Sequence, residues 1–137
     1  MLFLIFYKNE KMRIKYILEL DGVKIGYTEF EYADPPMGVV HGKIIFEEID
    51  SPYDLFKNHC KKFNVEITAD LPKDQLIATY IIPQLKVFLQ NGNQLQGWGG
   101  AIEGMDSDEF KIEFSGVSSE LMQTEFRHHL KKYNEQE

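Results

Sequence analysis

The chain is poor in the features that would tie it to a disulfide framework, a membrane or nucleic acid. Its single cysteine, Cys60, allows no intrachain disulfide, which fits a reducing compartment. No apolar run approaches the roughly 20 residues that a membrane-spanning helix needs. The 15 basic residues face 22 acidic ones, and this formal net charge of −7 disfavours binding to phosphates. The sequence therefore predicts a cytoplasmic protein that binds neither membranes nor nucleic acid.

Familiar catalytic and cofactor motifs are missing as well. The sequence has no HExxH, CxxC or GxSxG pattern. The glycine-rich residues 97–102 fail the dinucleotide fingerprint, because Ile102 stands where the last glycine is required. No Lys-Ser or Lys-Thr pair follows them, so a phosphate loop is not predicted either. We therefore predict no cofactor and no metal ion, and a non-enzymatic role is favoured over an enzyme.

Length and composition predict a single domain over residues 1–137. The chain is 43% hydrophobic and 13% aromatic, which is typical of globular proteins. A chain of this size buries roughly two thirds of its unfolded surface, so it needs no disulfide or metal to fold. The regular pattern begins only at Arg13. Residues 1–11 are therefore either an extension upstream of a natural start at Met12 or an extra edge strand over residues 2–7.

Residues 13–31 predict a β-hairpin closed by a two-residue turn, Asp21-Gly22. In this register one face buries three cross-strand pairs, and the other pairs Glu19 with Lys24, which carry opposite charges. In a regular strand Phe30 and Tyr32 would then point to the face opposite the buried one. Because both are apolar, they predict a bulge or bend near residues 28–29. The three pairs of the buried face are Leu20–Val23, Leu18–Ile25 and Tyr16–Tyr27.

A rigid turn follows, which we call the DPPMG elbow (residues 34–38). A residue that precedes proline is pushed towards extended geometry, and Gly38 permits a turn that other residues resist. Residues 39–46 then predict a strand with His41 and Lys43 on one side. Its apolar residues Val40, Ile44 and Phe46 face the other way.

Two helices are predicted, at residues 52–63 and near the C-terminus. Ser51 caps the first, and Pro52 suits its first position. Ser118 or Ser119 begins the second, whose inner stripe holds Met122, Phe126, Leu130 and Tyr133. Further strands are expected at residues 65–68, 75–82, 85–89 and 110–114. These elements predict an α+β domain with a largely antiparallel, strongly curved sheet, of which a half-barrel is one form.

The candidate binding surface gathers around the elbow. Glu29 and Glu31 are two residues apart on a strand and therefore share a face. Trp98 lies among glycines, where it is either an exposed aromatic contact or a core residue packed over small neighbours. Carboxylates beside a histidine suit metal binding or acid–base chemistry, although exposed carboxylates are usually only solvated. The candidate site residues are Glu29, Glu31, Asp34, Met37, His41 and Trp98.

Three functions fit these residues. The leading prediction is a small non-enzymatic protein-binding module, immunity-like or regulatory, which uses an acidic elbow surface to engage a protein partner. An acidic surface suits a basic partner. The second is a small-molecule or metal-dependent hydrolase that uses Glu31, Asp34 and His41. The third is a ligand-binding half-barrel with its pocket near Trp98. A pocket that holds the carboxylates favours the last two, and an exposed aromatic-acidic patch favours the first.

The remaining histidines and the cysteine suggest structural roles. Cys60 falls on the apolar face of the predicted helix 52–63, which predicts an inert buried thiol. His128 and His129 lie in the predicted last turns of the C-terminal helix, where positive charge suits the helix dipole. Glu125 precedes His129 by one turn, so a helical pair between them is expected.

Four segments together resemble a family of small uncharacterised bacterial proteins. They are residues 21–31, residues 34–39, residues 85–88 with the Asn-Gly turn that follows, and residues 125–129. The resemblance runs from about Met12 to the C-terminus and implies one domain with Met12 as its start. It departs at Arg127, where the family pattern has a proline. The family brings no assigned activity, so the resemblance implies no catalytic residue.

Overall fold

The first elements of the chain are the two strands of the predicted hairpin, β1 (Tyr16–Leu20) and β2 (Val23–Thr28). The computed structural model describes residues 13–135, so the predictions for residues 1–11 lie outside the described residues. Next to the Asp21-Gly22 turn the predicted register is confirmed, because Leu20 pairs with Val23 and Glu19 with Lys24. Beyond Glu19 a bulge shifts the register by one residue.

The bulge makes the rest of the predicted register wrong. Leu18 pairs with Gly26, which has a φ of +154°, and any side chain there would collide with the carbonyl oxygen of Ile45 on the neighbouring strand. Ile25 is the extra residue of the bulge, and its side chain still reaches the core. The close approach of the two backbones accounts for the glycine that follows it. Tyr27 is only half-buried, and Val23 is 65% exposed. Lys24 forms its ion pair with Glu47 (3.3 Å) rather than with Glu19.

The predicted bend after β2 is confirmed and separates it from β3 (Tyr32–Asp34). Phe30 lies at the break in a left-handed conformation, with a φ of 43°. The DPPMG elbow then forms a single 3-10 turn, η1 (Pro35–Met37), and all its peptide bonds are trans. Gly38 ends the turn in a left-handed conformation and leads into β4 (Val39–Phe46), which has the predicted bounds and facing.

Five further strands complete one antiparallel sheet. They run in the order β5-β6-β8-β9-β4-β2-β1-β7, and β3 pairs with β4 beside that path. The sequence does not predict β8, because three of its seven residues are glycine, which is uncommon within strands. A 3-10 turn, η2 (Pro72–Asp74), joins the strands of the β5–β6 hairpin. The strand bounds are β5 (Ile67–Leu71), β6 (Leu76–Thr79), β7 (Leu85–Phe88), β8 (Gly99–Met105) and β9 (Phe110–Ser115).

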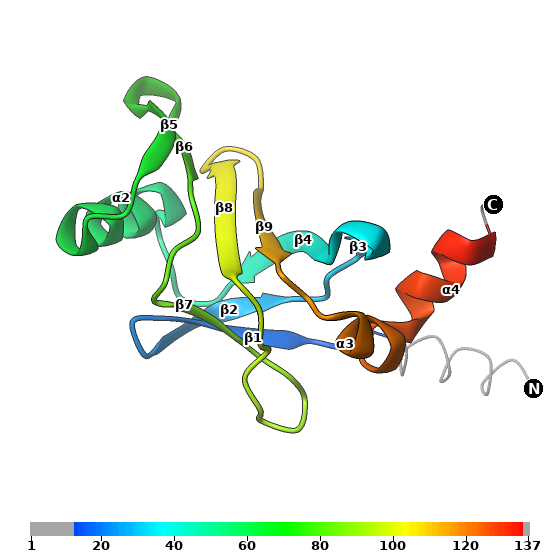
Figure 1. The fold of residues 1–137 in the computed structure, drawn as a ribbon. Helices are drawn as coiled ribbons and strands as arrows, with labels where there is room; N and C mark the ends of the chain where they lie inside the picture. Colours follow the sequence, from blue (N-terminus) through cyan, green and yellow to red (C-terminus); the bar gives the residue numbers. More distant parts are fainter. Residues whose placement is uncertain (1–12, 136–137) are drawn as a thin grey trace, which may run out of the picture.

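The prediction of a strongly curved sheet or half-barrel is wrong, because the sheet is neither closed nor strongly curled. β4 pairs through residues 40–43 with β9 and through residues 44–46 with β2. The change of direction between the two parts of the sheet therefore occurs at this one strand and is not spread over all of them. Figure 1 shows β1, β2 and β7 crossing the foot of β8 and β9.

The helices cover the ends of this sheet. α2 (Pro52–Phe63) is confirmed with its Ser51 cap, whose Oγ accepts a hydrogen bond from the Asp54 amide at 3.2 Å. The predicted C-terminal helix is two helices, α3 (Ser119–Thr124) and α4 (Arg127–Glu135). Phe126 stands between them, fully buried, with its ring centroid 5.6 Å from that of Tyr16 and 6.1 Å from that of Phe30. None of the helices in residues 13–135 is long and apolar enough to cross a membrane.

Candidate functional site

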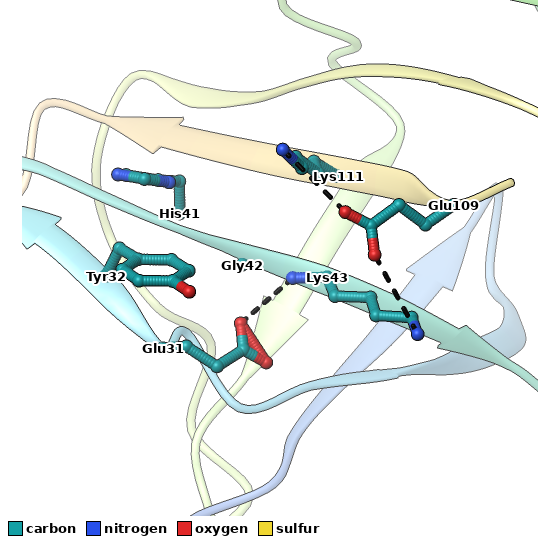
Figure 2. Close-up of a pocket in the computed structure, with 7 residues that line it drawn as sticks. All are labelled: Glu31, Tyr32, His41, Gly42, Lys43, Glu109 and Lys111. Carbon is teal, nitrogen blue, oxygen red and sulfur yellow. Dashed lines mark hydrogen bonds and ion pairs between the residues drawn. The ribbon is translucent and has the colours of Figure 1, made fainter.

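A pocket that holds part of the candidate chemistry lies where β3, β4 and β9 meet. It is an open hollow of about 400 Å³ on the sheet surface (Figure 2). Two predicted site residues, Glu31 and His41, are brought together here. Glu29, Asp34, Met37 and Trp98 do not line it. The complete lining is Glu31, Tyr32, His41, Gly42, Lys43, Glu109 and Lys111.

Glu31 has a structural partner within the pocket. Its Oε2 accepts a hydrogen bond from the backbone amide of Lys43 at 2.9 Å, drawn as a dashed line in Figure 2. The break between β2 and β3 leaves residues 42–43 of β4 without a strand neighbour on the edge away from β9, and the carboxylate satisfies the donor there. Gly42 makes room for this arrangement, because a side chain there would collide with the Glu31 carboxylate. Glu31 therefore accepts the hydrogen bond that a neighbouring strand would otherwise accept from β4.

Tyr32 and His41 form an aromatic wall on the same surface. They are cross-strand partners in β3 and β4, with ring centroids 5.3 Å apart and planes inclined by 22°. Figure 2 shows the two rings side by side. Tyr32 is 60% exposed and His41 is half-buried, so the stacked pair presents a rigid aromatic surface to solvent.

The charges around the pocket are balanced, in contrast to the acidic surface that the sequence predicts. Glu109 pairs with Lys43 at 3.8 Å and with Lys111 at 3.7 Å. These side chains are between one third and just over half exposed, so each ion pair contributes little to stability. With Glu31 opposite, two carboxylates face two ammonium groups, and the pocket has no strong field of one sign.

The other predicted site residues lie outside the pocket. Glu29 is half-buried, and Asp34 is exposed at the end of β3, opposite Val39. The Asp34 side chain makes no capping hydrogen bond to the elbow. Met37 is 69% exposed on the elbow itself. Trp98 is 76% exposed, so the core alternative is wrong for this residue; its ring lies over Gly116, where a Cβ atom would lie 2.5 Å from Trp98 Cγ.

The described residues gather no evident metal centre. Within residues 13–135, no group of three or more His, Cys, Asp or Glu side chains lies close enough to hold an ion. Cys60 is buried as predicted, and burial raises the pKa of its thiol, which makes the thiolate scarcer.

His129 differs most from its predicted role in the last turns of a helix, because it lies in the first turn of α4, where positive charge does not suit the helix dipole. It is 8% exposed, and its Nε2 lies 2.6 Å from the carbonyl oxygen of Phe30. Burial lowers the pKa of its imidazole, the hydrogen bond with the Phe30 carbonyl partly offsets this, and the charges of His128 and Lys132 act in the same direction as burial. The expected pair with Glu125 is wrong, because Glu125 Oε1 accepts a hydrogen bond from the Tyr16 hydroxyl at 3.2 Å.

Sequence reasoning missed part of the pocket because the relevant signal is not local. The alternation in residues 110–114 already places Lys111 on the side of the strand opposite the core. The missing information was that β9 pairs with β4, which sets Lys111 directly across from Lys43 and brings Glu109 within reach of both.

In comparisons with known proteins, neither a family model nor a curated protein nor a solved structure matches the chain. The resemblance to the small bacterial family therefore stays a prediction.

Proposed function

We propose that the chain is a non-enzymatic protein-binding module whose contact surface combines the Tyr32–His41 pair with the DPPMG elbow. The observation that carries this proposal is the exposure of two large apolar side chains, Tyr32 at 60% and Met37 at 69%, only five residues apart. Aromatic residues and methionine are enriched in the buried centres of protein interfaces. η1 and the stacked histidine hold both side chains on ordered backbone, which lowers the entropy lost on binding.

The chemistry of the partner follows from what surrounds these two side chains. Asp34 is exposed between them, and the whole chain carries a formal net charge of −7. A partner that presents an apolar or aromatic side chain to Tyr32 and a basic group to Asp34 fits this surface. Complementary charge at the rim acts mainly on the association rate and on specificity.

The two alternative functions have less support. A hydrolase would need Glu31, Asp34 and His41 to act on one substrate, but Glu31 is engaged by the Lys43 amide and Asp34 does not line the pocket. A ligand-binding half-barrel needs a curved sheet around an enclosed cavity. The sheet is open, and Trp98 is exposed at the start of β8.

The proposal is tested by affinity capture from the native host with three forms of the immobilised chain. These are the wild type, the double variant Tyr32→Ala/Met37→Ala, and the matched control Leu71→Ala/Tyr80→Ala. The control removes side chains of similar exposure, 51% and 56%, from another part of the surface. We expect the wild type and the control to enrich the same protein, and the first variant to lose it.

The captured protein is then purified and its Kd measured for each form. We expect the Tyr32→Ala/Met37→Ala variant to bind at least about tenfold more weakly, since each truncated interface anchor costs on the order of 1 kcal/mol or more. Thermal unfolding confirms that each variant is folded. Equal binding by the wild type and this variant, or an equal loss in the control, would contradict the proposed surface.

A further inference from the structure

The backbone break that positions the proposed surface is strained. Phe30 is a bulky residue at a φ of 43°, in the left-handed region that such residues rarely occupy. It is 1% exposed, and its amide donates a hydrogen bond to Thr28 Oγ1 at 3.2 Å. A conformation of this kind costs on the order of 1–3 kcal/mol and persists only when its surroundings hold it in place.

The C-terminal helix α4 supplies the most direct of these restraints. His129 Nε2 lies 2.6 Å from the carbonyl oxygen of Phe30, a contact that joins residues 99 positions apart. The carbonyl can only accept, so His129 carries its proton on Nε2. Figure 1 shows α4 beside β3 at one end of the sheet. Glu31 and Tyr32, the next two residues along the chain, take their positions from this same break.

The surroundings of His129 on balance disfavour a second proton, because burial opposes a charge there more strongly than the Phe30 carbonyl favours it. On α4 itself, the His128 ring lies 4.2 Å away between centroids, and Lys132 is close enough to repel a charged imidazole. His41 on β4 also disfavours a charge on His129. A small hollow of about 160 Å³ between β3 and α4 brings Glu31 and Tyr133 to the same place. Glu31 is the single carboxylate in that hollow, and its Oε2 accepts a hydrogen bond from the Lys43 amide.

We propose that His129 is a positioning residue, which latches α4 onto the β2–β3 break and so holds Glu31 and Tyr32 in the geometry of the binding surface. A neutral His129 keeps the latch closed. A second proton puts positive charge into a buried site beside His128 and Lys132, and α4 then detaches more easily. The consequence for binding rests on the proposed function, whereas the latch itself does not.

Hydrogen–deuterium exchange at pH 7.5 and pH 5.5, corrected for intrinsic rates, tests the latch without any partner. The chains are the wild type, His129→Ala, His129→Gln and a control, His59→Gln. His59 is another buried histidine, 7% exposed, and its Nε2 lies 2.9 Å from Gln84 Oε1. In the wild type we expect peptides that cover residues 28–34 to exchange about tenfold faster at pH 5.5, equivalent to a local opening easier by about 1.4 kcal/mol.

The variants separate the latch from general destabilisation. His129→Ala is expected to exchange fast over residues 28–34 at both pH values, and His129→Gln to lose the pH dependence, because glutamine does not titrate in this range. The His59→Gln control is expected to keep the wild-type response. Wild-type protection of residues 28–34 that does not change with pH, or that survives His129→Ala, would overturn the latch. If exchange responds as expected but the Tyr32→Ala/Met37→Ala variant captures the same protein as the wild type, the latch stands and the proposed function fails.

Discussion

Two turns of this molecule have nearly the same backbone but different surroundings. The DPPMG elbow (residues 34–38) and a second turn, the LPKDQ elbow (residues 71–75), both enclose a 3-10 turn that starts with proline. The residues before the two prolines have φ and ψ of −118° and 86° in the first and −117° and 87° in the second. Each turn closes with an amide that donates to the first proline carbonyl, at 3.1 Å and 3.2 Å. A stiff turn is therefore a general closure of hairpins in this fold and is not by itself a sign of function.

The elbows differ in the residue that ends each turn. Gly38 and Gln75 both adopt left-handed conformations, with φ of 67° and 50°. Gln75 is an exposed residue. At Gly38, by contrast, a Cβ atom would lie 2.7 Å from the carbonyl oxygen of Val117, which leads into α3. The first elbow requires glycine because another segment packs on it, and this contact ties it to the C-terminal helices.

The largest effect is expected from alanine at the residue that ends the first elbow, compared with alanine at the end of the second. We expect Gly38→Ala to lower the free energy of unfolding by about 2–4 kcal/mol, from the left-handed conformation and the collision with Val117. The matched change Gln75→Ala keeps a side chain in the same conformation and is expected to stay within about 0.5 kcal/mol. Urea unfolding of both variants measures the two values. Equal losses would mean that packing on the first elbow is unimportant.

A smaller effect is expected from two aspartates, Asp106 beside the LPKDQ elbow and Asp34 within the DPPMG elbow. Asp106 donates its amide to the Gln75 carbonyl at 3.2 Å, and its carboxylate accepts from Ser51 Oγ at 2.5 Å and from the Tyr53 amide at 2.8 Å. We expect Asp106→Ala to cost about 1–2 kcal/mol, as for the loss of a helix cap. Asp34 makes no capping bond, so Asp34→Ala is expected to change the free energy of unfolding by less than about 0.5 kcal/mol. Chemical denaturation compares the two, and a larger cost at Asp34 would contradict this account.

The smallest global effect is expected from pH, and it acts on the elbow that contacts α4. Burial is the main cause that lowers the pKa of both His128 and His129 below the ordinary histidine value. The unfolded chain therefore binds protons more readily than the folded one, so the free energy of unfolding falls as pH drops below about 6.5. We expect this slope to be shallower in the double variant His128→Gln/His129→Gln, measured by urea unfolding between pH 7.5 and 5.5. A slope identical to the wild type would contradict this origin.

The sequence predicted the elements whose signals are local. The Ser51-Pro52 start placed α2 at its observed bounds, and the alternation in residues 39–46 placed β4 with His41 and Lys43 on one side. Next to the Asp21-Gly22 turn, the hairpin register was also right. These features depend on capping and on side-chain alternation, which a few neighbouring residues determine.

The features that the sequence did not predict depend on distant partners. The bulge at Ile25 lies beside Gly26, where β4 brings the Ile45 carbonyl against the backbone. Glu31 resembled a solvated carboxylate because nothing local shows that Lys43 needs an acceptor. His129 was predicted only to suit a helix dipole, because nothing local points to its partner, Phe30, which lies 99 residues earlier. In the candidate site, sequence reasoning therefore found Glu31 and His41 but missed their setting.

The position of β4 also bears on how fast the chain folds. This strand pairs with β2, β3 and β9, and its partners in β9 lie about 70 residues further along the chain, as in the pair His41–Glu113. The β1–β2 and β8–β9 hairpins can form early, but β4 reaches β9, and β1 reaches β7 in pairs such as Ile17–Phe88, only across about 70 residues of chain. Contacts between such distant residues require a large loop to close first, which slows folding. The pairings of β4 with β9 and of β1 with β7 are thus the steps that we expect to limit the folding rate of the domain.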